Sequence, residues 1–210
     1  MDFNFKEIIK NEIFKTQSLI FQVMNDNNVI NTVEQISLVC IDAISKGNKI
    51  IFAGNGGSAA DSQHLAAEFV SKLCYDRPAM PAIAITTDTS ALTAIGNDYG
   101  YEYVFSRQLD AIARPGDIFF GISTSGNSKN IIEALKLSKQ RNITSIGFTG
   151  MSGGLMNDLC DYLLKIPGKE TAKVQECHIM LGHIICGLIE DAIHGKEYNI
   201  QFQTANIANL

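Results

Sequence analysis

Two polar side chains, His64 and Glu68, stand four residues apart in the segment QHLAAEF, whose apolar residues recur with helical spacing. Residues four apart share one face of a helix, so an imidazole and a carboxylate would lie side by side there. Such a pair can transfer protons or hold a metal ion. The alternative is a solvated surface glutamate and an ordinary core histidine, and the spacing taken alone favours that alternative.

A second group of polar side chains interrupts the apolar segment KVQECHIMLGHIICGLIEDAIH near the end of the sequence. A polar group on a buried helix costs free energy unless it is bonded, so we expect His183 to have a role. His178 competes for that role, with a place in the core or at the surface as the alternative. Gln175 and His183 are eight residues apart, about 12 Å along an ideal helix. They reach one small site only if both side chains angle toward each other.

Two loops rich in glycine and hydroxyl groups follow apolar runs and precede helical segments. They are GNGGS at 54–58 and STSGNS at 123–128. Helix N-termini have unpaired N–H groups and partial positive charge, which attract phosphate oxygens. A structural turn or a helix cap is the alternative, and for the first loop alone the two interpretations are equally good. The second loop has four hydroxyl residues in six positions, more than one cap uses, which favours ligand contact.

The glycine spacing narrows the class of ligand. Neither loop ends in Gly-Lys-Ser/Thr, which disfavours a nucleotide triphosphatase, and the glycines do not fit the dinucleotide-binding fingerprint. These loops therefore predict a site for a sugar phosphate.

The elements that would carry these residues alternate between helices and short apolar strands. Helical spacing over residues 3–25 and 29–46 predicts a helical hairpin, and over 170–194 it predicts a long final helix. Between them the apolar runs are KIIFAG, AIAIT, DIFFGIST, TSIGFTG and DYLLKIP. This alternation predicts an α/β fold whose parallel sheet is covered by helices on both faces. Ligands of such sheets bind beyond the carboxyl ends of the strands, where both loops would lie.

Composition is consistent with one domain of 210 residues, 46% of them hydrophobic. We expect a helical hairpin at 1–47, an αβα core at 48–195 and a polar tail at 196–210. The net charge of −5 argues against binding to nucleic acid or to an anionic membrane. Five cysteines without a C-x-x-C pair predict buried, reduced thiols in a cytoplasmic protein. We expect neither a signal peptide nor a membrane span.

Taken together, the motifs resemble those of the phosphoheptose isomerase family, which has a sugar isomerase (SIS) domain. The resemblance extends over residues 5–194 and rests on GNGGS, His64 with Glu68, GND at 96–98, GISTSGNS, and QECH at 175–178 with His183. It implies a flavodoxin-like, three-layer αβα sandwich and a homotetramer with active sites at subunit interfaces. It also implies one Zn2+ (zinc) ion per subunit at His64, Glu68, Gln175 and His183. The implied substrate contacts are Asn55, Gly56, Gly57, Glu68, Asn97, Asp98, Ser123, Thr124, Ser125, Ser128 and Gln175.

The implied activity converts sedoheptulose 7-phosphate to D-glycero-D-manno-heptose 7-phosphate through an enediol or enediolate. The product would supply nucleotide-activated heptose for surface glycans such as lipopolysaccharide core or capsule. We expect Glu68 to be the general base and His183 to exchange protons with the sugar oxygens, because imidazole titrates near neutral pH. A metal-bound carboxylate is a poorer base than a free one, which leaves open whether zinc is catalytic or structural.

The alternative function is that of a noncatalytic SIS-domain protein, which binds a replication initiator or senses a sugar phosphate. Such a protein can keep the fold and the serine-rich loop without the acid/base pair. Because Glu68 and His183 are both present, the sequence favours an enzyme.

Overall fold

The structure, a computed structural model, describes residues 4–195 and contains the five-stranded parallel sheet that the sequence predicts. The strands are β1 (Ile50–Gly54), β2 (Ala82–Ala84), β3 (Ile118–Ile122), β4 (Thr144–Thr149) and β5 (Tyr162–Lys165). All neighbouring strands are parallel, in the order β2-β1-β3-β4-β5. The strand order reverses between β1 and β3, which is the position where open α/β sheets bind ligands. The flavodoxin-like αβα sandwich is confirmed.

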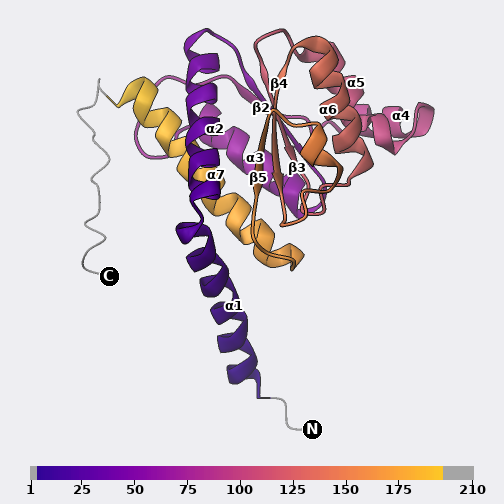
Figure 1. Cartoon of the computed structure of the whole chain (residues 1–210). Coiled ribbons are helices and arrows are strands. Elements are labelled where there is room, and N and C mark those ends of the chain that lie inside the picture. Colours follow the sequence, from indigo (N-terminus) through magenta and orange to yellow (C-terminus); the bar gives the residue numbers. More distant parts are fainter. Residues whose placement is uncertain (1–3, 196–210) are drawn as a thin grey trace.

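Helices cover both faces of the sheet because side chains alternate between the faces along each strand. Helices α2, α3 and α7 lie on one side of the sheet, and α5 and α6 on the other (Figure 1). In β1, Ile50 and Phe52 pack on the first side, whereas Ile51 and Ala53 pack on the second. Every residue of β1 and of β3 is buried. The helices are α1 (Phe5–Asn25), α2 (Asn27–Ser45), α3 (Gly57–Val70), α4 (Thr89–Asp98), α5 (Val104–Ile112), α6 (Lys129–Arg141) and α7 (Thr171–His194), with 3-10 helices η1 (Tyr101–Tyr103) and η2 (Gly154–Asp158).

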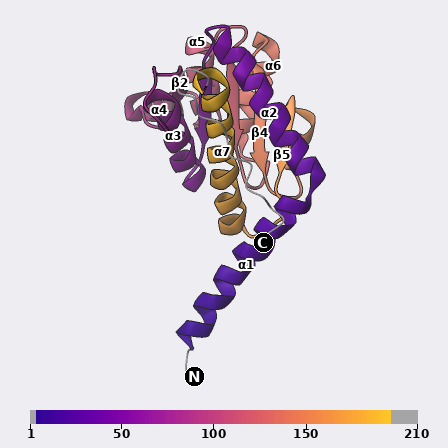
Figure 2. The same ribbon diagram turned by 90° about the vertical axis from the view of Figure 1, so that its left-hand side faces the viewer.

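The two N-terminal helices differ from the predicted hairpin. Only Asp26 separates α1 from α2, and its side chain accepts a hydrogen bond from the Asn28 N–H, which caps α2. One residue is too short to reverse the chain, since helical hairpins use loops of about 2–5 residues. Instead, α1 leads away from the body of the molecule (Figures 1 and 2).

The cysteines are all free, as predicted, but they are not all buried. Cys40, Cys177 and Cys186 are buried and Cys160 is partly buried, whereas Cys74 is exposed in the connection that follows α3. Within residues 4–195, no helix combines the length and apolar character needed to cross a membrane. The predicted polar tail at 196–210 lies outside the described residues.

Candidate functional site

The first loop turns the chain sharply from β1 into α3. A Cβ on Gly54 would lie 2.4 Å from the Ser58 backbone oxygen, and Gly56 has a φ of 55°, so both positions require glycine. The Ser58 N–H donates to the Asn55 carbonyl. Within residues 4–195, the backbone N–H groups of Gly56 and Gly57 have no hydrogen-bond partner. They are therefore free to donate to an anionic ligand, as expected for the predicted contacts.

Asn55 connects this first loop to the start of α6. Its side chain donates to the Asn130 carboxamide oxygen at 2.9 Å and accepts from the Asn130 amide at 2.8 Å. The Tyr101 hydroxyl also donates to Asn55, at 3.2 Å. Asn130 is 3% exposed, which is unusual for asparagine. Its position just after the hydroxyl-rich loop was the available sequence signal. Sequence reasoning overlooked both Asn130 and Tyr101.

The second loop gathers its hydroxyl groups at the end of β3. The Ser123 Oγ lies 2.8 Å from the Ser128 Oγ and 3.4 Å from the Ser125 Oγ. Ser128 is the N-cap residue of α6, yet its side chain makes no capping hydrogen bond. The Ser123 Oγ also accepts from the Ser128 N–H at 3.4 Å, and the Ser125 Oγ accepts from the Asn127 N–H at 3.2 Å. The Ser128 hydroxyl contacts Ser123 and does not cap α6, which favours the ligand interpretation for this residue.

Two hollows lie beside these loops. One has a volume of about 400 Å³ and lies between the β1 and β3 ends, and its lining includes Asn55, Tyr101 and Ser128. The other, of about 480 Å³, lies between the second loop and the start of α7, and its lining includes Thr124, Ser125 and Lys169. Both volumes are within the range of small-molecule sites.

The His–Glu pair of α3 meets a histidine of α7. The Nε2 atoms of His64 and His183 are 2.8 Å apart, and the Glu68 Oε1 lies 3.3 Å from the His64 Nε2. The two helices approach closely at this point, because a Cβ on Gly182 would lie 2.7 Å from a methyl carbon of Leu65. The predicted meeting of a carboxylate and an imidazole from distant parts of the chain is present in the structure.

This His64–Glu68–His183 cluster has the geometry and donor atoms of a zinc site. One ligand atom from each residue lies within 4.8 Å of the others. Two imidazole nitrogens on one tetrahedral zinc ion lie about 3.3 Å apart, given Zn–N bonds of about 2.0–2.1 Å. The observed 2.8 Å is close to this separation. The donor atoms and their separation therefore fit a zinc ion.

Three other predicted site residues, Gln175, Asn97 and Asp98, lie outside the His64–Glu68–His183 cluster. Gln175 lies against the first turn of α3, where its amide nitrogen is 3.5 Å from the Ser58 Oγ. It therefore connects α7 to the first loop, and its place as a fourth metal ligand stays a prediction. Asn97 and Asp98 are exposed at the end of α4 and bond to each other. Their contact with substrate also stays a prediction.

His178 lies in the core, which is the structural alternative stated for it above. It is 1% exposed, its Nε2 lies 3.2 Å from the Thr149 carbonyl oxygen, and its ring packs on Phe148. Burial lowers the pKa of His178 to about 4, partly offset by the bond to Thr149. The ring is therefore neutral at pH 7, so that Nε2 donates to the carbonyl, and His178 is not a general acid there.

Asp61 is a residue of the site that sequence reasoning missed. It precedes His64 by three residues and Glu68 by seven, so the three share one face of α3. Its Oδ2 atom is buried without a hydrogen-bond partner. Burial raises the pKa of the Asp61 carboxyl, and the charges of His64 and His183 oppose this rise. The helical spacing of the three residues was the available signal.

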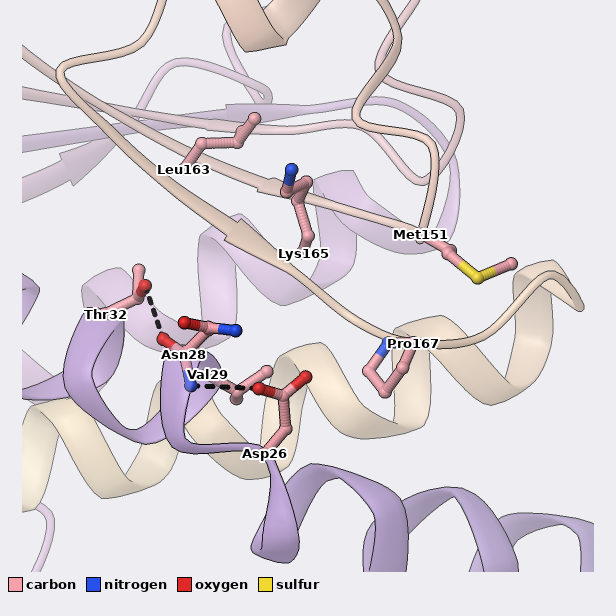
Figure 3. A pocket seen from close by; sticks show the side chains of 8 residues that line it. All are labelled: Asp26, Asn28, Val29, Thr32, Met151, Leu163, Lys165 and Pro167. Atoms are coloured by element: carbon pink, nitrogen blue, oxygen red, sulfur yellow. Dashed lines mark hydrogen bonds between the residues drawn. The ribbon is translucent and has the colours of Figure 1, made fainter.

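A further hollow, of about 200 Å³, lies between the start of α2 and β5 and is separate from this site (Figure 3). Three of its polar residues bond to one another at the start of α2. Asp26 accepts from the Asn28 N–H, and Thr32 donates to the Asn28 carbonyl. Such capping bonds explain the polar lining without a ligand.

Comparisons with known proteins agree on one family. The sequence profile of the SIS domain matches residues 12–150. A phosphoheptose isomerase of Aneurinibacillus thermoaerophilus is 52% identical over 192 residues, which cover 91% of this chain and 97% of that protein. Phosphoheptose isomerase 2 of Campylobacter jejuni is 56% identical over 178 residues, covering 85% and 89%. The solved structure of a phosphoheptose isomerase from Neisseria gonorrhoeae has a TM-score of 0.84 at 39% identity, over 90% of this chain and 100% of that one.

Proposed function

We propose, from the premise that this chain belongs to the phosphoheptose isomerase family of SIS-domain proteins, that it converts sedoheptulose 7-phosphate to D-glycero-D-manno-heptose 7-phosphate. The observation that carries the proposal is the meeting of Glu68, His64 and His183. His64 and His183 are 119 residues apart in the chain, yet the three side chains lie within hydrogen-bond reach. Two of them are on α3, the helix that begins at the first loop. A noncatalytic binding protein needs only the loops.

The reaction moves a carbonyl from C2 to C1 by proton transfers. Glu68 removes the proton from C1 while the carbonyl oxygen at C2 takes a proton from His183, which gives an enediol. Return of the carbon-bound proton to C2 and loss of the O1 proton then complete the aldehyde. The Glu68 Oε1 faces His64, so Oε2 is the atom assigned to the carbon-bound proton.

The phosphate fixes the sugar for these transfers. The N–H groups of Gly56 and Gly57, with the hydroxyls of Ser123, Ser125 and Ser128, surround the space that we assign to it. Binding energy from this remote group holds the reacting carbons against the base, which lowers the barrier of the chemical step.

We also assign one zinc ion per subunit to His64, Glu68 and His183, with Gln175 as the predicted fourth ligand. When bound, the ion would act as a Lewis acid that polarises the sugar oxygens. The support is the separation of the two imidazole nitrogens and the mixed nitrogen and oxygen donor set.

The test is an isomerase assay on the purified protein with sedoheptulose 7-phosphate in D2O, followed by NMR. We expect turnover with deuterium at C2 of the product, because a proton removed by Glu68 exchanges with solvent. Glu68→Gln should lower kcat by a factor of about 10² to 10⁴. Glu133→Gln, at an exposed ion pair on α6, is the matched control and should be unchanged. Turnover by Glu68→Gln at the wild-type rate would show that another group is the base.

The proposed assembly is a homotetramer with active sites at subunit interfaces. Its support is α1, which leads away from the body (Figure 2). Several apolar side chains of α1 are 55–65% exposed. These side chains are Ile9, Ile13, Phe14, Phe21 and Met24. Exposed apolar surface of this kind marks an interaction site. Light scattering should report a tetramer for the wild type and smaller species for Ile13→Asp, whereas Lys10→Glu on the same helix should stay tetrameric.

The cellular setting that we propose follows from the substrate and the thiols. Five free cysteines suit a reducing compartment, and a sugar phosphate is an intracellular metabolite, so we place the enzyme in the cytoplasm. Its product would supply ADP- or GDP-heptose for lipopolysaccharide or capsule. Bacterial cells lacking the gene should lose heptose from these glycans and regain it with the wild-type gene but not with Glu68→Gln.

A further inference from the structure

We infer that a buried ion pair, Arg77 with Glu190, is a positioning element that sets the separation of the His64–Glu68 face of α3 from His183 on α7. Neither residue touches the substrate in the mechanism proposed above. The inference rests on that proposed function, because the residues it positions are those assigned to the reaction and to zinc.

Arg77 binds the end of the helix that carries Glu68. One of its terminal nitrogens donates to the backbone carbonyl of Glu68 itself at 2.7 Å, and the other donates to the Phe69 carbonyl at 2.7 Å and the Ser71 carbonyl at 3.1 Å. These are the carbonyl groups that the last turn of a helix leaves unpaired. A cation also interacts favourably with the partial negative charge at a helix C-terminus. Arg77 therefore holds the backbone at Glu68 directly.

Glu190 connects this helix end to α7. Its carboxylate accepts from the Arg77 Nε at 2.9 Å and from the backbone N–H groups of Leu73 at 3.0 Å and Cys74 at 2.8 Å. The side chains of Arg77 and Glu190 are 0% and 1% exposed. Both charged side chains are therefore shielded from water. Glu190 follows His183 by seven residues, which places both on the same face of α7.

The pair acts together with the close approach at Gly182. Gly182 and Leu65 bring the helices into contact beside the His64–His183 rings, and the Arg77–Glu190 pair joins them again about two turns later. Two contacts along parallel helices fix both the distance and the rotation of α7 relative to α3. A single contact would leave the helices free to pivot.

A contribution to folding stability does not by itself explain why an ion pair is buried at this position. Removing two charges from water is costly, and buried ion pairs can often be replaced by apolar residues with no loss of stability. What an apolar pair cannot reproduce is the directed set of hydrogen bonds to the Glu68 carbonyl and the Leu73 and Cys74 N–H groups. The gain is therefore in geometry, at the residues where a small displacement has the largest effect.

The test uses Arg77→Met/Glu190→Leu, which leaves no lone buried charge, and Glu190→Gln, which keeps an acceptor. Zinc affinity of the metal-free proteins is measured by competition with a coloured chelator, and kcat and KM are measured separately. We expect the double variant to bind zinc about 10- to 100-fold more weakly, as for other outer-shell changes, and to lose kcat with KM within about twofold. Glu190→Gln should fall between it and the wild type.

Asp117→Asn is the matched control. The Asp117 side chain is 3% exposed and pairs with Lys49, which directly precedes β1. Neither residue belongs to α3 or α7, so this variant disturbs another ion pair that has one buried partner. It should leave zinc affinity and kcat unchanged even where it lowers stability.

The outcomes separate this inference from the proposed function. A folded double variant with wild-type zinc affinity and kcat overturns the inference; if that variant does not fold, the same values in Glu190→Gln do so. If the wild type binds zinc but does not turn over the substrate, the proposed isomerase function is refuted, and the zinc affinities of the variants still test the role of the Arg77–Glu190 pair. If the wild type turns over the substrate without binding zinc, the zinc assignment is refuted, and the kcat values of the variants test the role of the pair. A wild type that neither binds zinc nor turns over the substrate overturns the isomerase function, the zinc assignment and the positioning inference together.

Discussion

Acid should unfold this protein partly through one buried imidazole, that of His178. Burial lowers its pKa from 6.5 to about 4. Between these two pH values, His178 is therefore protonated in the unfolded chain but neutral in the folded chain. Stability is therefore present above pH 6.5 and is lost as the pH falls toward 4. Linkage gives a loss of about 2 kcal/mol at pH 5 and about 3 kcal/mol at pH 4 from this residue alone.

The assay is urea unfolding at pH 7 and pH 5, at one protein concentration because assembly contributes to stability. His178→Gln removes the titration and keeps a donor for the Thr149 carbonyl, which His178 bonds at 3.2 Å. The wild type should lose about 2 kcal/mol more than this variant between the two pH values. Other titrating groups are common to both proteins and cancel in the difference.

His194→Gln, at the partly exposed end of α7, is the control and should behave as the wild type does. The reasoning is refuted if the wild type and His178→Gln lose the same free energy between pH 7 and pH 5. That result would mean that the folded chain protonates His178 as easily as the unfolded chain does.

Three further outcomes are expected. Ser125→Ala should raise KM about 10-fold or more in steady-state kinetics, since a hydrogen bond to a charged group is worth about 1.5–3 kcal/mol, and should leave stability unchanged because Ser125 is exposed. Gly182→Ala should lower the free energy of unfolding in urea by about 1–3 kcal/mol, because its Cβ would lie 2.7 Å from Leu65. Prolonged treatment with a chelator should reduce isomerase activity, and added zinc should restore it whereas magnesium should not; full activity of metal-free protein would refute the metal assignment.

The sheet and the two loops were predictable because their signals are local. Continuous apolar runs indicate buried parallel strands, and glycine or serine at the following residues indicates a turn into a helix. The His64–Glu68 spacing is local too. Its meeting with His183 required the fold, and the resemblance to a known family supplied that before the structure confirmed it.

The features that sequence analysis missed are non-local or depend on one residue. Nothing in the pattern around Arg77 indicates a partner 113 residues later, and the Asn55–Asn130 bridge likewise joins residues 75 apart. The predicted hairpin differs from the structure because Asn-rich punctuation indicates a helix boundary but not the angle across it. That angle depends on Asp26, which caps α2 and gives the chain no length in which to reverse.

Contacts between α3 and α7 follow the same order along both helices: first Ser58 with Gln175, then His64 with His183, and finally the α3 end with Glu190 through Arg77. A one-residue slip of α7 would turn every one of these side chains by about 100° at once. These contacts between α3 and α7 should therefore be lost together. Hydrogen exchange should find that the amides of both helices open in a single cooperative event, and that a ligand bound to the histidines slows exchange along their full length.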